Sequence, residues 1–164
     1  MTDSARNRIS RKAMNRALSA LAFALVLSVI SCSGPASSEC FVKNADCDAY
    51  GRYIFDLDMS DSLHTFSIDL YSAFTCRDEV FAGFTGVPVN VLWESPEGSV
   101  YEENVILPAS GVSNVTHFGK SFSASYRKGV RPVVNGEWKL YLSVPRDSVR
   151  KYGMTGMGIK ISKE

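Results

Sequence analysis

Short segments in which apolar and polar residues alternate dominate the chain from about residue 52 onward. Residues 87–93 and 138–144 are the clearest, because every second side chain in each is a valine, leucine or tryptophan. A period of two is the pattern of a strand with one buried face. Residues 146–152 are the only helical candidate in this part, and so short a helix is not stable alone. The sequence therefore predicts a mainly β fold, an antiparallel β-sandwich, with a jelly roll as one candidate topology.

The segments between these runs indicate how the strands connect. Residues 95–98 (Ser-Pro-Glu-Gly) favour a tight turn, so that residues 87–93 and 100–107 form a hairpin. In residues 118–126, Lys120 falls on the same face as the apolar side chains, and the serines fall on the other face, where they would meet solvent or a shallow groove. The other predicted strands cover residues 53–58, 66–71, 138–144 and 157–162.

Residues 1–31 have the form of a bacterial lipoprotein signal peptide. A basic segment precedes the apolar run of residues 17–30, and residues 29–32 (Val-Ile-Ser-Cys) have the form of a lipobox. About 14 apolar residues at 1.5 Å each fall short of the ~30 Å hydrocarbon core. We therefore expect cleavage rather than a permanent span, with an uncleaved anchor as the alternative. The mature chain would begin at Cys32 and be held on a membrane by acyl chains such as palmitate on that residue.

The remaining chain has the size of one domain. We expect the lipidated cysteine and a small, polar tether in residues 32–50, and the β-sandwich domain in residues 51–164. Five of the 18 Lys and Arg residues leave with the signal, so the mature part carries 13 basic and 16 acidic residues. This slightly acidic balance, without a basic stripe, argues against nucleic acid as a partner.

Three cysteines remain once Cys32 is assigned to lipid. Cys40 and Cys47 are the expected disulfide pair in an oxidising compartment, because closing this short loop would contribute roughly 2 kcal/mol. A bridge from Cys40 or Cys47 to Cys76, and three free buried thiols, are the alternatives.

The sequence offers little support for an enzyme. His64 and His117 could act as bases, with Asp58, Asp61 or Asp69 to orient them, but no nucleophile elbow, zinc motif or phosphate loop accompanies them. Neither histidine has a further Cys or His at zinc-like spacing. We therefore expect no catalytic activity, no metal and no cofactor.

The C-terminal half resembles a known family. Residues 136–144, Arg150 and residues 153–164 look like the end of the gliding-motility lipoprotein GldH family of Bacteroidetes. The resemblance extends to the lipobox, to an early strand at residues 66–70 and to a strand with a Pro-Gly turn at residues 87–98. It implies a non-enzymatic outer-membrane lipoprotein that acts by protein contacts, as an assembly component of a gliding-motility or secretion-type envelope machinery.

The resemblance also bears on O-glycosylation and on the location of the protein in the cell envelope. Ser62 and Ser148 each lie in an Asp-Ser-aliphatic tripeptide, which resembles an O-glycosylation sequon of these bacteria, although a turn or a helix cap explains the tripeptide equally. Ser33 follows the lipidated cysteine in place of Asp, which argues against retention at the inner membrane. Residues 34–38 lack the acidic or Lys-containing cluster of a surface-export signal. We expect the domain to face the periplasm, with surface exposure as the alternative.

A lipid-anchored carbohydrate-binding module is the alternative function. Five aromatic side chains could form a platform for sugars: Trp93, Tyr101, Tyr126, Trp138 and Tyr141. Both tryptophans fall in register with the apolar face of their strands, however, which favours core positions. Two tryptophans exposed side by side on one sheet face would instead favour sugar binding.

Overall fold

The computed structural model of the chain describes residues 37–113 and 115–164. The predicted signal peptide, the lipobox and Cys32 lie outside these residues. Within the described part, no helix has the length and apolar character needed to cross a membrane.

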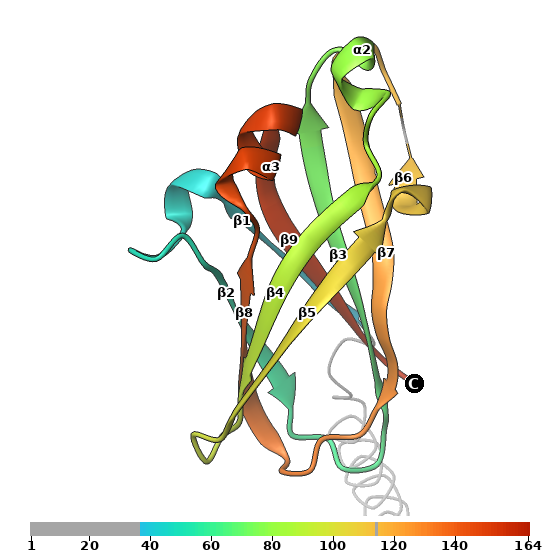
Figure 1. Cartoon of the computed structure of the whole chain (residues 1–164). Helices are drawn as coiled ribbons and strands as arrows, with labels where there is room; N and C mark the ends of the chain where they lie inside the picture. Colours follow the sequence, from blue (N-terminus) through green and yellow to red (C-terminus); the bar gives the residue numbers. More distant parts are fainter. Residues whose placement is uncertain (1–36, 114) are drawn as a thin grey trace, which may run out of the picture. The chain divides into compact units, whose positions relative to one another are not determined.

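Two antiparallel sheets pack face to face and form a β-sandwich (Figure 1). We call the five-stranded sheet sheet A; its strand order is β1 (Ser37–Lys43), β9 (Met154–Lys163), β3 (Phe66–Thr75), β7 (Gly119–Val130) and β6 (Val112–Ser113). Sheet B has four strands, in the order β2 (Tyr53–Met59), β8 (Gly136–Ser143), β4 (Gly86–Glu94) and β5 (Val100–Pro108). The fold predicted from the alternating segments is thereby confirmed.

The core lies between the two sheets and follows the alternation of the sequence. In β2, Phe55 and Leu57 point inward and are buried, whereas Asp56 and Asp58 point outward and are exposed. Each large apolar side chain buried in this way contributes roughly 1.5–3 kcal/mol. A strand shifted by one residue would expose these side chains, so burial also fixes the register.

The predicted hairpin and helix are confirmed. Strands β4 and β5 pair from Gly86 opposite Pro108 to Glu94 opposite Val100, and Gly98 in the turn has φ 81°. The short helix α3 (Arg146–Tyr152) links β8 to β9, as expected. Three other short helices complete the connections: η1 (Asn44–Asp46), α2 (Asp78–Phe81) and η2 (Ala109–Gly111).

The sandwich begins earlier than the sequence analysis expected. Residues 37–43, assigned there to the tether, form β1 and pair with β9 at the edge of sheet A. Most side chains of β1 are exposed, because little of the protein covers this edge strand. The strand therefore has no buried face that an alternation of apolar and polar residues could reveal in the sequence. Val42 alone is partly buried against the core.

The connecting loops divide between the two ends of the sandwich (Figure 1). The lower end in the figure carries the loops of residues 60–65, 95–99 and 131–135, together with the start of β1 and the C-terminus. The upper end carries α2 and α3.

Candidate functional site

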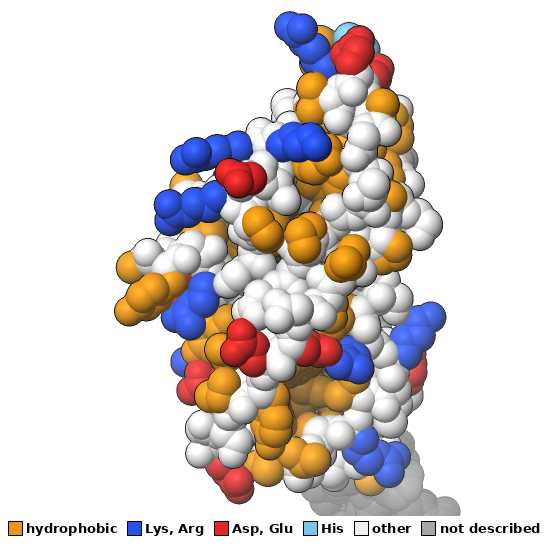
Figure 2. Space-filling model, viewed as in Figure 1, with side chains coloured by type: hydrophobic (Ala, Val, Ile, Leu, Met, Phe, Trp, Pro, Cys, Tyr) orange, Lys and Arg blue, Asp and Glu red, His pale blue; other side chains and the backbone are white. Residues whose placement is uncertain are grey.

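A groove lined mainly by apolar and aromatic side chains lies between β5 and β7 near the lower end. It encloses about 310 Å³ and opens to solvent; Figure 2 shows the lower half of the molecule hollowed and lined by hydrophobic side chains. We call it the aromatic groove; its lining residues are Met59, Trp93, Tyr101, Glu103, Arg127, Val130, Arg131, Pro132, Val133 and Trp138. Five strands, β2, β4, β5, β7 and β8, and the loop of residues 131–135 contribute to it.

Trp93 and Trp138 form the inner wall of the groove. Both point into the sandwich; the Trp138 side chain is 6% exposed and Trp93 is half-buried. Their rings meet edge to face, 6.1 Å between centroids, and the Tyr101 ring packs on Trp138 at 6.3 Å. The Trp138 indole donates to the Val134 carbonyl at 2.8 Å, and the Trp93 indole donates to the Tyr126 hydroxyl at 2.9 Å. Hydrogen bonds within the protein therefore hold both indoles in place.

An ion pair borders the groove on the β5–β7 side. Arg127 donates to both carboxylate oxygens of Glu103, at 2.6 and 2.7 Å, and the Tyr126 hydroxyl donates to the same carboxylate. Hydrogen bonds from Arg127, and then from Tyr126, hold the pKa of Glu103 below its usual range. Burial, followed by the hydrogen bond to Glu103, raises the pKa of Tyr126 to about 12. At neutral pH the carboxylate is therefore ionised and the phenol is neutral.

The chemistry available in the groove is that of binding. The indole N–H groups are already satisfied, so a ligand meets ring faces, methionine and valine side chains, and the charged border. In the described part of the chain, no three side chains of His, Cys, Asp or Glu come together as metal ligands. The groove suits an apolar or amphipathic group.

The aromatic residues predicted as a platform do not all meet. Trp93, Tyr101, Tyr126 and Trp138 lie in or beside the groove, whereas Tyr141 lies on the outer face of sheet B. There its hydroxyl donates to Glu94 at 2.6 Å, and Arg52 lies over its ring. The two tryptophans face inward, as their register predicted, and are not exposed together on a sheet face.

The three cysteines within the described residues, Cys40, Cys47 and Cys76, are unbridged in this structure. Cys40 is exposed on β1, whereas Cys47 and Cys76 are partly buried. The Cys47 thiol lies 3.9 Å from the Lys43 carbonyl, and burial raises its pKa. The bridge between Cys40 and Cys47 stays a prediction for the oxidised protein.

The two histidines lie at opposite ends of the sandwich. His64 Nδ1 lies 2.8 Å from Asp61 at the lower end, and His117 Nδ1 lies 3.1 Å from Asp78 at the upper end. Ser62 is exposed in the loop beside Asp61, and Ser148 is half-buried on α3. Their O-glycosylation stays a prediction.

Sequence reasoning missed the ion pair of the groove and the contacts of a buried lysine. Glu103 and Arg127 lie 24 residues apart, so no local pattern joins them. The Lys120 side chain is 1% exposed, and its ammonium group donates to the carbonyls of Cys76, Thr116 and His117 at 3.1–3.3 Å. The signal for Lys120 was present, because this residue falls on the apolar face of its strand.

Comparisons with known proteins add little to this description. No protein-family model matches the chain, and no curated protein matches it in sequence. Among solved structures it is similar to a protein from Sulfurospirillum deleyianum, with 6% identity, a TM-score of 0.35, and 80% of this chain and 99% of that chain covered. It is also similar to dimeric latent PorU from Porphyromonas gingivalis, with 10% identity and a TM-score of 0.36; the match covers 78% of this chain and 12% of PorU. Likenesses this weak carry no argument about function.

Proposed function

We propose that this chain is a non-enzymatic binding component of the bacterial cell envelope, and that an envelope protein inserts an apolar side chain into the aromatic groove. The observation that carries the proposal is the groove itself. It is open, mainly apolar, and walled by two tryptophans that internal hydrogen bonds hold in place. A wall fixed before binding reduces the entropy lost on association.

The composition of the groove fits a protein contact. Trp, Tyr and Arg are the residue types that most often dominate the binding energy of protein interfaces, and the groove contains all three. Val133, which lines the groove, is 80% exposed and presents an apolar side chain at its mouth. The contact would therefore have an apolar centre and a charged border, which is the common anatomy of an interface.

The second part of the proposal concerns the location of the protein in the cell envelope and the machinery to which it belongs. The lipobox supports anchoring through lipid on Cys32, and the residues after it favour the periplasmic face of the outer membrane. The resemblance to the gliding-motility lipoproteins supports a role in assembling gliding or secretion machinery. This part depends on sequence alone.

A photo-crosslinker placed in the groove tests the protein partner. Val133 is 80% exposed at the mouth of the groove, and Ile106 is 75% exposed on the outer face of sheet B. With p-benzoylphenylalanine in place of Val133, we expect one envelope protein to be captured in intact cells, and we expect Tyr101→Ala to abolish that product. The crosslinker at position 106 is the matched control. Identical products from both positions, or a Val133 product that Tyr101→Ala leaves unchanged, would refute the groove as the contact site.

Substitution of the lipobox cysteine tests the anchor. Cys32→Ala removes the thiol that would receive the diacylglycerol, so we expect unprocessed precursor that carries no lipid. Metabolic labelling with an alkyne palmitate analogue, followed by membrane fractionation, checks this outcome. A variant that still matures and fractionates with the outer membrane would show that the anchor is not a lipid on Cys32.

A further inference from the structure

Two aromatic rings lie flat on the outer face of sheet A, away from the groove. A Cβ atom on Gly158 would lie 2.3 Å from Cζ and 2.5 and 2.7 Å from the two Cε atoms of Tyr71, so this ring lies face down on the glycine. A Cβ atom on Gly156 would lie 2.8 Å from two atoms of the Phe41 ring. The two rings are 5.8 Å apart between centroids and 25° from parallel. They therefore lie side by side along β9, and both are partly exposed.

A Cβ atom at either glycine would lie too close to its neighbours: the Tyr71 ring at Gly158, and the Phe41 ring together with the Val42 carbonyl oxygen, 2.3 Å away, at Gly156. Neither Gly156 nor Gly158 has a positive φ, so lack of space, and not backbone conformation, excludes a side chain at both positions. The missing side chains leave the space that the rings occupy. Because β9 carries no side chain at these two positions, the two aromatic rings can lie close over the strand.

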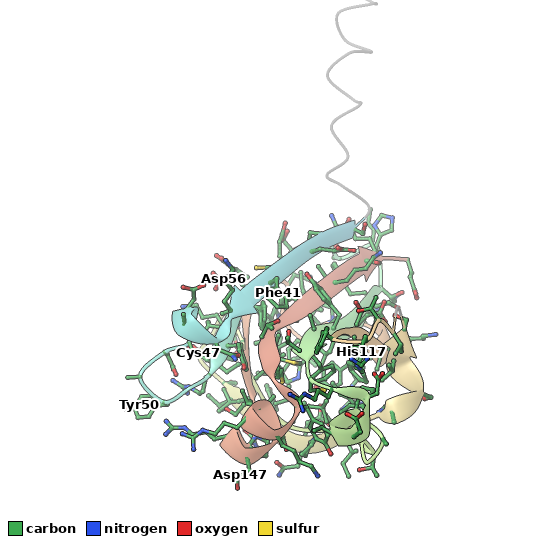
Figure 3. All side chains as sticks on the ribbon, turned by 90° about the horizontal axis from the view of Figure 1, so that it is seen from above. Phe41, Cys47, Tyr50, Asp56, His117 and Asp147 are labelled. Carbon is green, nitrogen blue, oxygen red and sulfur yellow. The ribbon has the colours of Figure 1, made fainter. Side chains whose placement is uncertain are left out.

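Polar groups surround the rings. Glu39 and Lys160 pair at 3.2 Å on one side, and Asp69 lies opposite both Lys160 and Ser125 in the strand register. Phe41 is 38% exposed and Tyr71 is half-buried, and both line a shallow depression of about 490 Å³. Figure 3 shows Phe41 on β1 with β9 beside it. We call this surface the ring platform (Glu39, Phe41, Asp69, Tyr71, Ser123, Lys160).

We propose that the ring platform binds a saccharide. The C–H bonds on one face of a pyranose ring carry partial positive charge, and the open face of an aromatic ring is negative. The carboxylates of Glu39 and Asp69 accept hydrogen bonds from sugar hydroxyls, and Lys160 and Ser123 donate to sugar oxygens. A sugar presents both kinds of group at once, which is what the platform offers.

Other ligands fit this surface less well. A lipid chain or an apolar protein face would bury the Asp69 carboxylate without a partner and would remove the Glu39–Lys160 ion pair from water. The base of a nucleotide could stack on the rings, but the carboxylates of Glu39 and Asp69 would repel the phosphate of that nucleotide. Each alternative leaves part of the surface unpaired, whereas a saccharide satisfies the rings and the carboxylates together.

The ring platform is separate from the proposed contact site for a protein partner. None of the residues of the ring platform lines the aromatic groove, and the platform lies on the opposite side of sheet A from the core. Either site can fail its test while the other passes. Glycan binding was the alternative function predicted from the sequence. The ring platform would perform it at a different site and with different residues.

Calorimetric titration of the mature chain, residues 32–164 with Cys32→Ser, tests the platform. The probes are cellohexaose, chitohexaose and polysaccharide purified from the envelope of the source bacterium. We expect at least one to bind, and we expect Phe41→Ala to weaken that binding about tenfold or more. Phe41 is on an edge strand and partly exposed, so its loss should leave the fold intact.

Three further variants complete the experiment. Asp69→Asn keeps the size of the side chain and should also weaken binding, because an amide is a poorer acceptor than a carboxylate. Tyr71→Phe keeps the ring and should bind normally, and Tyr101→Ala changes only the groove and should do the same. Failure of all three probes to bind, or equal binding by the Phe41→Ala variant, would overturn the proposal. Binding that Tyr101→Ala abolishes and Phe41→Ala spares would place the saccharide in the groove, and would also overturn it.

Discussion

Replacement of Lys120 by methionine should lower the free energy of unfolding by about 3 kcal/mol. The Lys120 ammonium group ends among three backbone carbonyls, those of Cys76, Thr116 and His117, and 2.9 Å from Asp78. It joins the chain before α2 to the chain before β7 at the upper end of the sandwich. Methionine fills a similar volume but donates no hydrogen bond, so these carbonyls lose their shared donor.

Lys128→Met is the matched control. Lys128 lies on the same strand, β7, but is exposed to solvent, so the same substitution should change stability by about 0.5 kcal/mol or less. Urea denaturation of both variants measures the difference, provided that the m-value is unchanged. Equal midpoints for the two variants would mean that the buried ammonium group contributes nothing to the stability of this end.

Replacement of Gly153 by alanine should cost about 3 kcal/mol or more. Gly153 ends α3 with φ 58° and ψ 43°, a left-handed conformation that costs other residues about 1–2 kcal/mol. A Cβ atom there would also lie 2.1 Å from the Thr75 carbonyl oxygen, which is backbone and cannot rotate away. The Gly153 carbonyl accepts from the Thr75 N–H at 2.8 Å, so a shift that relieves the contact breaks this bond.

Gly129→Ala separates the two causes. Gly129 has φ 61°, nearly the same as Gly153, but a Cβ atom there meets nothing within 4 Å. This variant should therefore show only the cost of the left-handed conformation, about 1 kcal/mol. The difference between the two thermal midpoints measures the clash with Thr75. If Gly129→Ala lowered stability as much as Gly153→Ala does, the left-handed backbone conformation alone would explain the loss of stability, and the clash with Thr75 would contribute nothing.

Local sequence patterns predicted the elements that bury one face. Strands β4 and β8 and the helix α3 follow from alternation, turn residues and helix length, which are properties of neighbouring residues. The pattern failed for β1, because an edge strand with exposed side chains has no buried face to reveal. Lys120 shows the opposite case: the pattern placed it inward correctly, but only the structure shows which carbonyls it binds.

The candidate sites depend on contacts that cross the fold. Phe41 and Tyr71 are 30 residues apart and meet only because β9, the last strand, lies between β1 and β3. Likewise, the ion pair of Glu103 and Arg127 joins strands of different sheets. Sequence alone could name the aromatic residues of the groove, but it could not separate Tyr141 from the others. Strand order decides these contacts, and strand order is not a local property.

The pairing of β1 with β9 has a mechanical consequence. Seven residue pairs, from Ser37 opposite Ser162 to Lys43 opposite Gly156, hold β1 in sheet A. Hydrogen bonds of a ladder run perpendicular to the strands, so tension applied to Ser37 along β1 loads all of them together in shear, instead of breaking them one at a time. A domain pulled from its N-terminal side along this strand would therefore resist unfolding better than one whose edge strand is peeled away one hydrogen bond at a time.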